Sequence, residues 1–168
     1  MYLRRLKPID AILMLEWMHD LSVTKDLHTD FSQKTIVDCE RFIETSLCDK
    51  SNLHLAVADE RDTYMGTVSL KNIIEDSAEF AIVVRKCAMG KGFSKYAMTE
   101  MLKIGMEELG LQKIYWYVSP DNKRALRFYD KSGYQRMDIE TVERIAKIKS
   151  DIFTPNYIWY CVKKAIVS

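Results

Sequence analysis

The segment from residue 83 to residue 94 constrains the fold more than any other part of the sequence. Val83 and Val84 end an apolar run with the composition of a strand, and a loop containing Gly90 and Gly92 follows it. The residues after this loop have the spacing of a long helix. A helix start presents free backbone N–H groups and the positive end of the helix dipole, so the segment predicts an anion-binding site between a strand and a helix.

Two common nucleotide-binding motifs do not fit this loop. The sequence contains no G-x-x-x-x-G-K-[ST] string of a P-loop. The dinucleotide motif G-x-G-x-x-G also fails, because Lys95 stands at the position of the third glycine. By itself, the Gly90-Lys91-Gly92 loop is equally consistent with an ordinary turn at the start of a helix.

Short strands and helices alternate along the rest of the chain. The strands are expected at 2–6, 53–58, 64–70, 78–84, 114–118 and 157–162, with another beginning at Tyr134. The helices are expected at 8–19, after an N-cap at Ser32, from Gly90 to Gly110 and from about Asn122 to Gly133. The segment 140–154 is ambiguous between helix and irregular structure. The pattern predicts one α/β domain over 1–168 (α+β by some conventions) with a mixed, mostly antiparallel sheet.

Composition and charge exclude several classes of protein. The chain has 168 residues, of which 48% are hydrophobic, and its formal net charge of +1 gives no reason to expect nucleic acid or an anionic membrane surface as a partner. No segment is long and apolar enough to span a bilayer, and no apolar signal-peptide core follows the first residues. The four cysteines are scattered, and no histidine lies at metal-ligand spacing from them. We therefore expect a cytoplasmic protein without a metal site.

A second informative segment runs from Asn122 to Tyr134. Alone, it is consistent with an N-capped amphipathic helix whose Phe128 and Tyr129 face the core. Together, the two segments resemble the GNAT superfamily of N-acetyltransferases. The second segment matches the family signature N-x-x-A-x-x-F-Y-x-K-x-G-[FY] at every fixed position, and residues 90–93 resemble the loop that binds the pyrophosphate of acetyl-CoA.

The resemblance extends from about residue 53 to residue 134, with two departures. The loop motif is often written [QR]-x-x-G-x-[GA], whereas Cys87 stands at its first position, with Arg85 two residues earlier. Ser94 stands where a further glycine is common. Backbone amides bind the phosphates in this family, so the departures affect the geometry of the loop and not its presence.

The resemblance implies a splayed pair of strands, 78–84 and 114–118, with the pantetheine arm of acetyl-CoA in the gap. The residues that it implies for the co-substrate are Val83, Val84, Arg85, Met89, Gly90, Lys91, Gly92, Phe93, Ser94 and Asn122. Asn122 also has the ordinary interpretation of a helix N-cap, and the two roles are compatible.

Direct attack of an amine on a thioester requires a proton acceptor for the amine and a donor for the leaving thiolate. By resemblance, Tyr129 occupies the position of the donor. Glu79, a mid-strand carboxylate between apolar neighbours, is the candidate base, with a solvent-facing strand glutamate as the alternative. His19, His28 and His54 have ordinary interpretations as a helix end, a loop and a strand position.

Acceptor specificity in the family lies in the first two helices and the loop between them, which points to Trp17, His19, Asp20 and His28. Asp26 and Asp30 add negative charge suited to a cationic amine, although helix-end and loop chemistry also explains them. The sequence predicts transfer to a primary amine of a small molecule, with an amino sugar ahead of a protein N-terminus. The alternatives are a ribosomal-protein-type N-terminal acetyltransferase, a non-catalytic acyl-CoA-binding domain and a different acyl donor such as succinyl-CoA. A homodimer is compatible with the sequence.

Overall fold

One six-stranded sheet, in the order β1-β2-β3-β4-β5-β6, runs through the molecule. The computed structural model describes residues 1–138, 140–141 and 156–164. The strands are β1 Tyr2–Arg5, β2 Leu53–Ala58, β3 Tyr64–Ile74, β4 Ser77–Val84, β5 Lys113–Val118 and β6 Ile158–Lys163. The helices are α1 Asp10–Met18, α2 Leu21–Thr24, α3 Ile36–Ser46, α4 Phe93–Lys103 and α5 Lys123–Lys131, with a 3-10 turn η1 Lys86–Ala88 and a π-helical turn η2 Ile104–Glu108.

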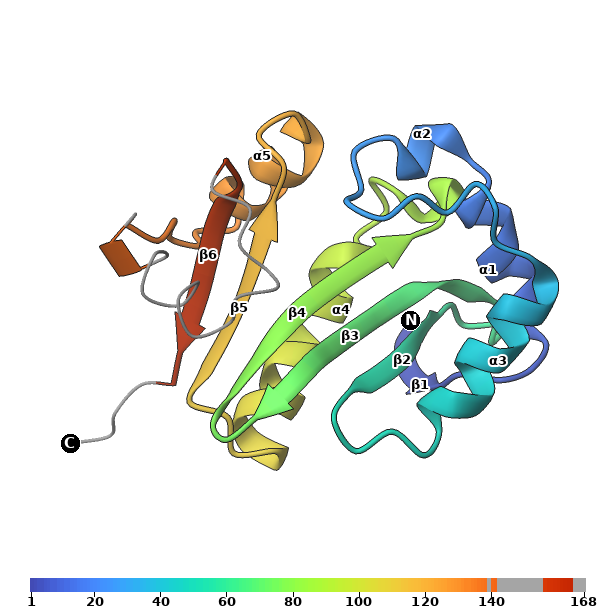
Figure 1. Ribbon diagram of the computed structural model, residues 1–168, viewed down its shortest axis with the longest axis horizontal. Helices are drawn as coiled ribbons and strands as arrows, with labels where there is room; N and C mark the ends of the chain where they lie inside the picture. The colour runs from blue at the N-terminus through green and yellow to red at the C-terminus, as the bar shows by residue number, and fades with distance from the viewer. Residues whose placement is uncertain (139, 142–155, 165–168) are drawn as a thin grey trace.

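The sheet confirms the predicted mixed α/β architecture and the splayed strand pair. Neighbouring strands pair antiparallel except β4 and β5, which pair in parallel. Their pairing covers only Ser77–Glu79 of β4 and Lys113–Tyr115 of β5. Beyond these residues the two strands separate toward their C-terminal ends, as Figure 1 shows. The separation leaves backbone groups of both strands without a strand partner at the centre of the sheet.

Helices cover the two faces of the sheet, because side chains of each strand point alternately to opposite faces. Ala78 and Phe80 of β4 belong to a core shared with α4 and α5. Val83 packs instead in a second core with residues of α1 and α3. In Figure 1, α4 lies behind the sheet and α5 beside the C-terminal end of β5. No helix among the described residues has the length and hydropathy needed to cross a membrane.

The structure corrects three local predictions. The N-cap of α3 is Thr35 and not Ser32, because Thr35 and Asp38 form a reciprocal capping box. The strand expected from Tyr134 is reduced to a single bridge between Arg136 and Tyr160. The long helix predicted up to Gly110 ends as an α-helix at Lys103 and continues as η2. The ambiguous segment falls, over 142–154, outside the described residues.

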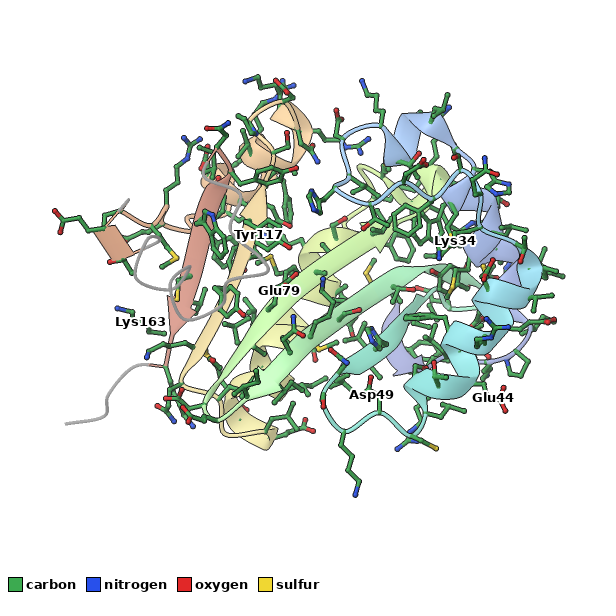
Figure 2. The ribbon with its side chains drawn as sticks, viewed as in Figure 1. Lys34, Glu44, Asp49, Glu79, Tyr117 and Lys163 are labelled. Atoms are coloured by element: carbon green, nitrogen blue, oxygen red, sulfur yellow. The ribbon has the colours of Figure 1, made fainter. Side chains whose placement is uncertain are left out.

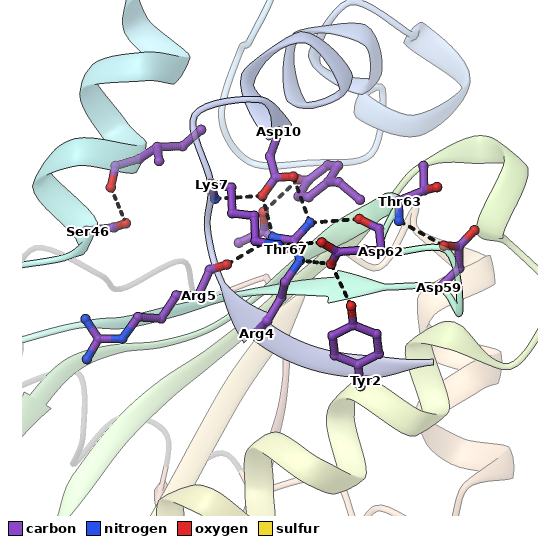
Figure 3. Close-up of polar contacts among 12 residues, drawn as sticks. Tyr2, Arg4, Arg5, Lys7, Asp10, Ser46, Asp59, Asp62, Thr63 and Thr67 are labelled. Carbon is purple, nitrogen blue, oxygen red and sulfur yellow. Dashed lines mark hydrogen bonds and ion pairs between the residues drawn. The ribbon is translucent and has the colours of Figure 1, made fainter.

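A polar cluster fastens β1 to the start of α1 and to the β2–β3 turn (Figure 3). The Arg4 guanidinium donates to both oxygens of Asp10, at 2.7 and 2.9 Å, and its Nε donates to Asp62 at 2.5 Å. Asp10 is buried and also accepts from the backbone N–H of Lys7. The buried carboxylate is thus fully paired, and it fixes the helix that covers one face of the sheet.

Substitution of Asp10 by alanine should therefore destabilise the protein strongly. It leaves the half-buried Arg4 without its bidentate partner and the Lys7 N–H without an acceptor, and breaking a buried ion pair costs about 3 kcal/mol. Urea unfolding followed by circular dichroism would measure the change. The Asp62 side chain is 39% exposed and that of Asp10 is 2% exposed, so Asp62→Ala should cost clearly less; equal losses for the two variants would contradict this account.

Candidate active site

The separated ends of β4 and β5 border a cavity of about 510 Å³. Its walls come from β4, from the loop before α4, from α5 and from α2 and the residues after it. Seven of the ten predicted co-substrate residues line it: Val83, Val84, Met89, Gly90, Gly92, Ser94 and Asn122. The structure therefore brings most of the predicted set together around one space.

The glycine loop forms the end of this cavity that suits an anion. Gly90 and Gly92 have φ angles of +74° and +87°, and a Cβ at either position would meet no atom within 4 Å. Gly92 is the N-cap of α4, so the backbone N–H groups of the first turn have no partner within the helix. Space next to free N–H groups at a helix start is the arrangement that phosphate groups require.

Three cations that the sequence analysis did not identify also line the cavity: Lys95, Arg124 and Lys131. No acidic side chain among the described residues lines it. Coenzyme A carries several phosphate charges, so this excess of positive charge fits it electrostatically. Lys131 is the fixed lysine of the matched signature, so the signature could have identified it from the sequence.

Asn122 performs its ordinary structural role and lines the cavity as well. Its Oδ1 accepts a hydrogen bond from the Ala125 N–H at 3.0 Å, which caps α5. The side chain is buried, and its position next to the cavity follows from the helix start that it caps.

Tyr129 lies on the cavity side of α5 and is buried. Its ring packs against Trp116 and Tyr160, with centroid distances of 5.2 and 5.3 Å. Burial raises the pKa of its hydroxyl well above the usual range, with smaller contributions from Tyr160 and Tyr134. The hydroxyl therefore stays protonated and has no hydrogen-bond partner in the part of the chain that the structure describes. It is a donor without an acceptor at the edge of the cavity. Phe128 lines the same cavity and also packs on the core.

A second cavity, of about 260 Å³, lies on the opposite side of β4, under α1 and α3. Its walls are mainly apolar and include Met14, Trp17, Met18, Phe31 and Phe42. Its polar lining comes from Lys34, Asp38, His54, Thr67, Ser69 and Lys71. Ile82 and Val83 of β4 line both cavities. The two cavities thus meet at the part of β4 that is not paired with β5.

Glu79 lies at the end of the β4–β5 pairing, on the face that bears the second cavity. Figure 2 shows it at the middle of the sheet, close to Tyr117 of β5. The carboxylate is buried and is engaged by Lys71 at 2.6 Å and by the Asn72 amide at 3.4 Å. It lines neither cavity.

Of the four residues predicted to bind the acceptor, only Trp17 lines the second cavity, and its indole N–H donates to the Tyr64 hydroxyl at 3.0 Å. His19 contacts the Lys34 carbonyl at 2.9 Å, and His28 contacts the Tyr157 hydroxyl at 3.2 Å. Asp20 caps α2, and the hydrogen bonds from Ser22 lower its pKa. These three lie outside both cavities, and the contacts just named engage them elsewhere in the fold.

Three predicted co-substrate residues also do not line the first cavity: Arg85, Lys91 and Phe93. Arg85 forms an ion pair with Glu16 of α1 at 2.9 Å and donates to the Tyr64 carbonyl. It ties the loop after β4 to α1. Phe93 is partly buried against the main core.

The polar lining of the second cavity was missed at the sequence level, although a signal existed. Thr67, Ser69 and Lys71 alternate along β3 and therefore share one face of the sheet. A row of polar side chains on one face of an otherwise apolar strand indicates that this face meets either solvent or a binding site. Here the row faces a cavity covered by helices.

Comparisons with known proteins identify the family and agree with the fold. The family model described as the acetyltransferase (GNAT) domain matches residues 1–135. The spermidine N(1)-acetyltransferase of Vibrio cholerae is 26% identical over 125 residues, which cover 71% of this chain and 72% of that protein. A crystal structure of the V. cholerae enzyme in complex with CoA and spermine has a TM-score of 0.77 at 21% identity, with 96% and 94% of the two chains covered. The PaiA N-acetyltransferase of Thermoplasma acidophilum, crystallised with coenzyme A, has a TM-score of 0.72 at 20% identity, with 97% and 98% covered.

Proposed function

The chain belongs to the GNAT acetyltransferases, which use acetyl-CoA as acetyl donor, and we propose that it transfers the acetyl group to the primary amine of a small molecule by direct attack. One observation carries this proposal: two cavities on opposite sides of β4 share Ile82 and Val83. A donor in the cationic cavity and an acceptor in the apolar cavity would meet at this strand without any intermediate carried by the protein.

The first cavity supports the donor half of the reaction. In the proposed arrangement the pyrophosphate binds at the Gly90–Ser94 turn, and the thioester end lies toward Tyr129. The amine nitrogen attacks the thioester carbonyl, the C–N bond forms and the C–S bond breaks. The raised pKa of Tyr129 keeps its O–H in place as a hydrogen-bond donor to the sulfur as negative charge develops there. The retained hydroxyl favours an active enzyme over a non-catalytic acyl-CoA-binding domain.

The second cavity indicates which amines fit. Its charged and titratable lining consists of Lys34, Lys71, Asp38 and His54. Lys71 is paired with Glu79, and the Asp38 carboxylate accepts from the Thr35 backbone and hydroxyl. No unpaired carboxylate among the described residues lines the cavity, whereas Lys34 has no ion-pair partner there. With Lys71 compensated by Glu79, the charges of Lys34 and Asp38 cancel, so the cavity offers a flexible polycation no net negative charge to bind it.

An amine on a compact ring suits the walls better. Trp17 and Phe31 pack edge to face at 5.1 Å, and Phe42 packs on His54 at 4.8 Å. Such aromatic walls bind the apolar face of a sugar or another ring. Among the candidate acceptors we therefore rank an amino sugar above a linear polyamine and above a protein N-terminus. A polyamine is the second candidate, because relatives are named spermidine N-acetyltransferases.

A substrate panel tests this order. We expect amino sugars to show a kcat/KM at least about tenfold above that of spermidine, a difference of about 1.4 kcal/mol. Lys34→Glu should raise kcat/KM for spermidine and leave the affinity for acetyl-CoA unchanged. A preference for spermidine that Lys34→Glu does not alter would contradict the charge argument. Acetylation of ribosomal-protein N-termini alone would favour the protein-type alternative, and equal rates with succinyl-CoA would show that the donor site does not select acetyl.

The cytoplasmic location and the homodimer stay predictions. One related V. cholerae structure is described as dodecameric, and its likeness to this chain concerns the fold. Sedimentation of the purified protein would determine whether copies of this chain associate.

A further inference from the structure

A serine–histidine pair lies in the polar lining of the second cavity. His54 of β2 and Ser69 of β3 are directly opposite each other in the sheet, and their side chains are joined by a 2.7 Å contact between Nδ1 and Oγ. Ser69 is buried, at 6% exposure, and both residues line the cavity. The short distance fits a hydrogen bond from the serine hydroxyl to a ring nitrogen that carries no proton.

The pair belongs to a row of cross-strand neighbours that ends on β4, the strand that lines both cavities. Ser69 is opposite Ala81 of β4, as His54 is opposite Ser69. Directly opposed side chains begin about 4.5–5.5 Å apart. Ala81 lines the second cavity and precedes Ile82, which lines both. Thr67, opposite Val83, also lies beside the place where donor and acceptor are expected to meet, but its hydroxyl contacts the Tyr64 hydroxyl at 2.7 Å. Ser69 is therefore the β3 hydroxyl near this place that has a basic partner.

The surroundings keep the imidazole of His54 neutral near pH 7. Burial lowers its pKa below the ordinary value of 6.5, and the charge of Lys71 acts in the same direction. Asp49 opposes this shift from the loop before β2, where Figure 2 shows it. From α3 and its approach, Asp38 and Lys34 face the same cavity with opposite charges.

We propose that Ser69 and His54 together form the proton acceptor for the amine. This inference rests on the proposed function. As the amine nitrogen bonds to the thioester carbon, its proton passes to Ser69 Oγ, and the serine proton passes to His54 Nδ1. The C–S bond breaks, Tyr129 donates a hydrogen bond to the thiolate, and the thiolate takes a proton from solvent. His54 then releases its proton to solvent, which restores the starting state.

Glu79 is the competing base, one row away along the sheet. Its carboxylate is held by Lys71 and lines neither cavity, whereas Ser69 and His54 both line the acceptor cavity. The geometry gives Glu79 the role of positioning Lys71. Glu79→Gln should therefore change turnover less than His54→Gln does.

Kinetics of four variants and one control, with the best amine of the panel as acceptor, test the relay. Ser69→Ala and His54→Gln should each lower kcat by roughly a hundredfold or more, with little change in the affinity for acetyl-CoA. The double variant should be no slower than the slower single variant, because the two groups act in one path. Ser69→Thr keeps the hydroxyl and should restore most of the rate. Ser77→Ala, a hydroxyl at the far end of β4, is the control for removing a strand serine.

The pH profile supplies a readout that a structural role would not change. In the wild type, kcat/KM should fall below a pKa lower than 6.5, where His54 becomes protonated. His54→Gln should lose this limb. Its kcat/KM should approach that of the wild type at high pH, where the amine loses its proton without the relay. Three results would each overturn the relay. They are an acid limb of kcat/KM that His54→Gln leaves unchanged, single variants with kcat within about threefold of the wild type, and losses that multiply in the double variant. A wild type that releases CoA with no primary amine would instead contradict the proposed function itself, and the relay with it.

Discussion

Replacing Tyr129 by phenylalanine should lower turnover by roughly a hundredfold to ten-thousandfold, the usual contribution of a positioned acid. The substitution removes one hydroxyl and keeps the ring against Trp116 and Tyr160. Because the hydroxyl has no partner among the described residues, substitution removes no hydrogen bond to them, and the melting temperature should hardly change. The hydrogen bond to sulfur strengthens only as the thiolate forms, so kcat and kcat/KM should fall together.

Tyr134→Phe is a matched control for this experiment. Tyr134 also packs on Trp116, at 5.1 Å, but it does not line the donor cavity. It should keep wild-type turnover. If Tyr129→Phe also keeps near wild-type turnover while chemistry limits the rate, Tyr129 is a core tyrosine and the donor is another group. A large loss of stability would instead show that the hydroxyl is structural.

Substitution of Gly92 by glutamate should abolish the binding of acetyl-CoA. At a hundred times its dissociation constant, a ligand that binds only the native state adds about 2.7 kcal/mol to the free energy of unfolding. Acetyl-CoA should therefore raise the melting temperature of the wild type by several degrees, and that of Gly92→Glu not at all. The new side chain meets open space, so the loss comes from filling the phosphate site with negative charge.

Gly110→Glu separates this effect from backbone strain. Gly110 has a comparable φ of +71° and equally open surroundings, but it lies after η2 and away from the cavity. Both variants should lose similar stability because a side chain is strained at positive φ. Only Gly92→Glu should lose the response to acetyl-CoA. Persistence of that response would place the phosphates elsewhere.

The lining of the cavity proposed for the donor was predictable because a continuous segment encodes much of it. One strand, one loop and one helix start bring Val83, Gly90, Gly92 and Ser94 to the same space, and the sequence order alone places them there. The cap at Asn122 likewise follows from local chain geometry. Lys95 and Arg124 were missed because a cation on a helix surface has no distinctive spacing.

The cavity proposed for the acceptor depends on contacts between distant segments. His54 and Ser69 become neighbours through the register of β2 with β3, and Ala81 joins them through the register of β3 with β4. No single-strand pattern contains such a register. The family resemblance pointed to Asp20 and His19 in the region of the first two helices, but a helix cap and a carbonyl contact engage them. A polar residue in a loop most often serves the loop itself.

The central claim is that a donor in the cationic cavity and an amine in the apolar cavity react directly across β4. The release of CoA thiol from acetyl-CoA, measured with and without a primary amine and coupled to mass spectrometry of the acceptor, tests it most directly. We expect amine-dependent thiol release that matches the N-acetylated product one for one, with no acetyl group left on the protein. Thiol release that does not depend on the amine, or an acetylated protein that forms and decays during turnover, would contradict it.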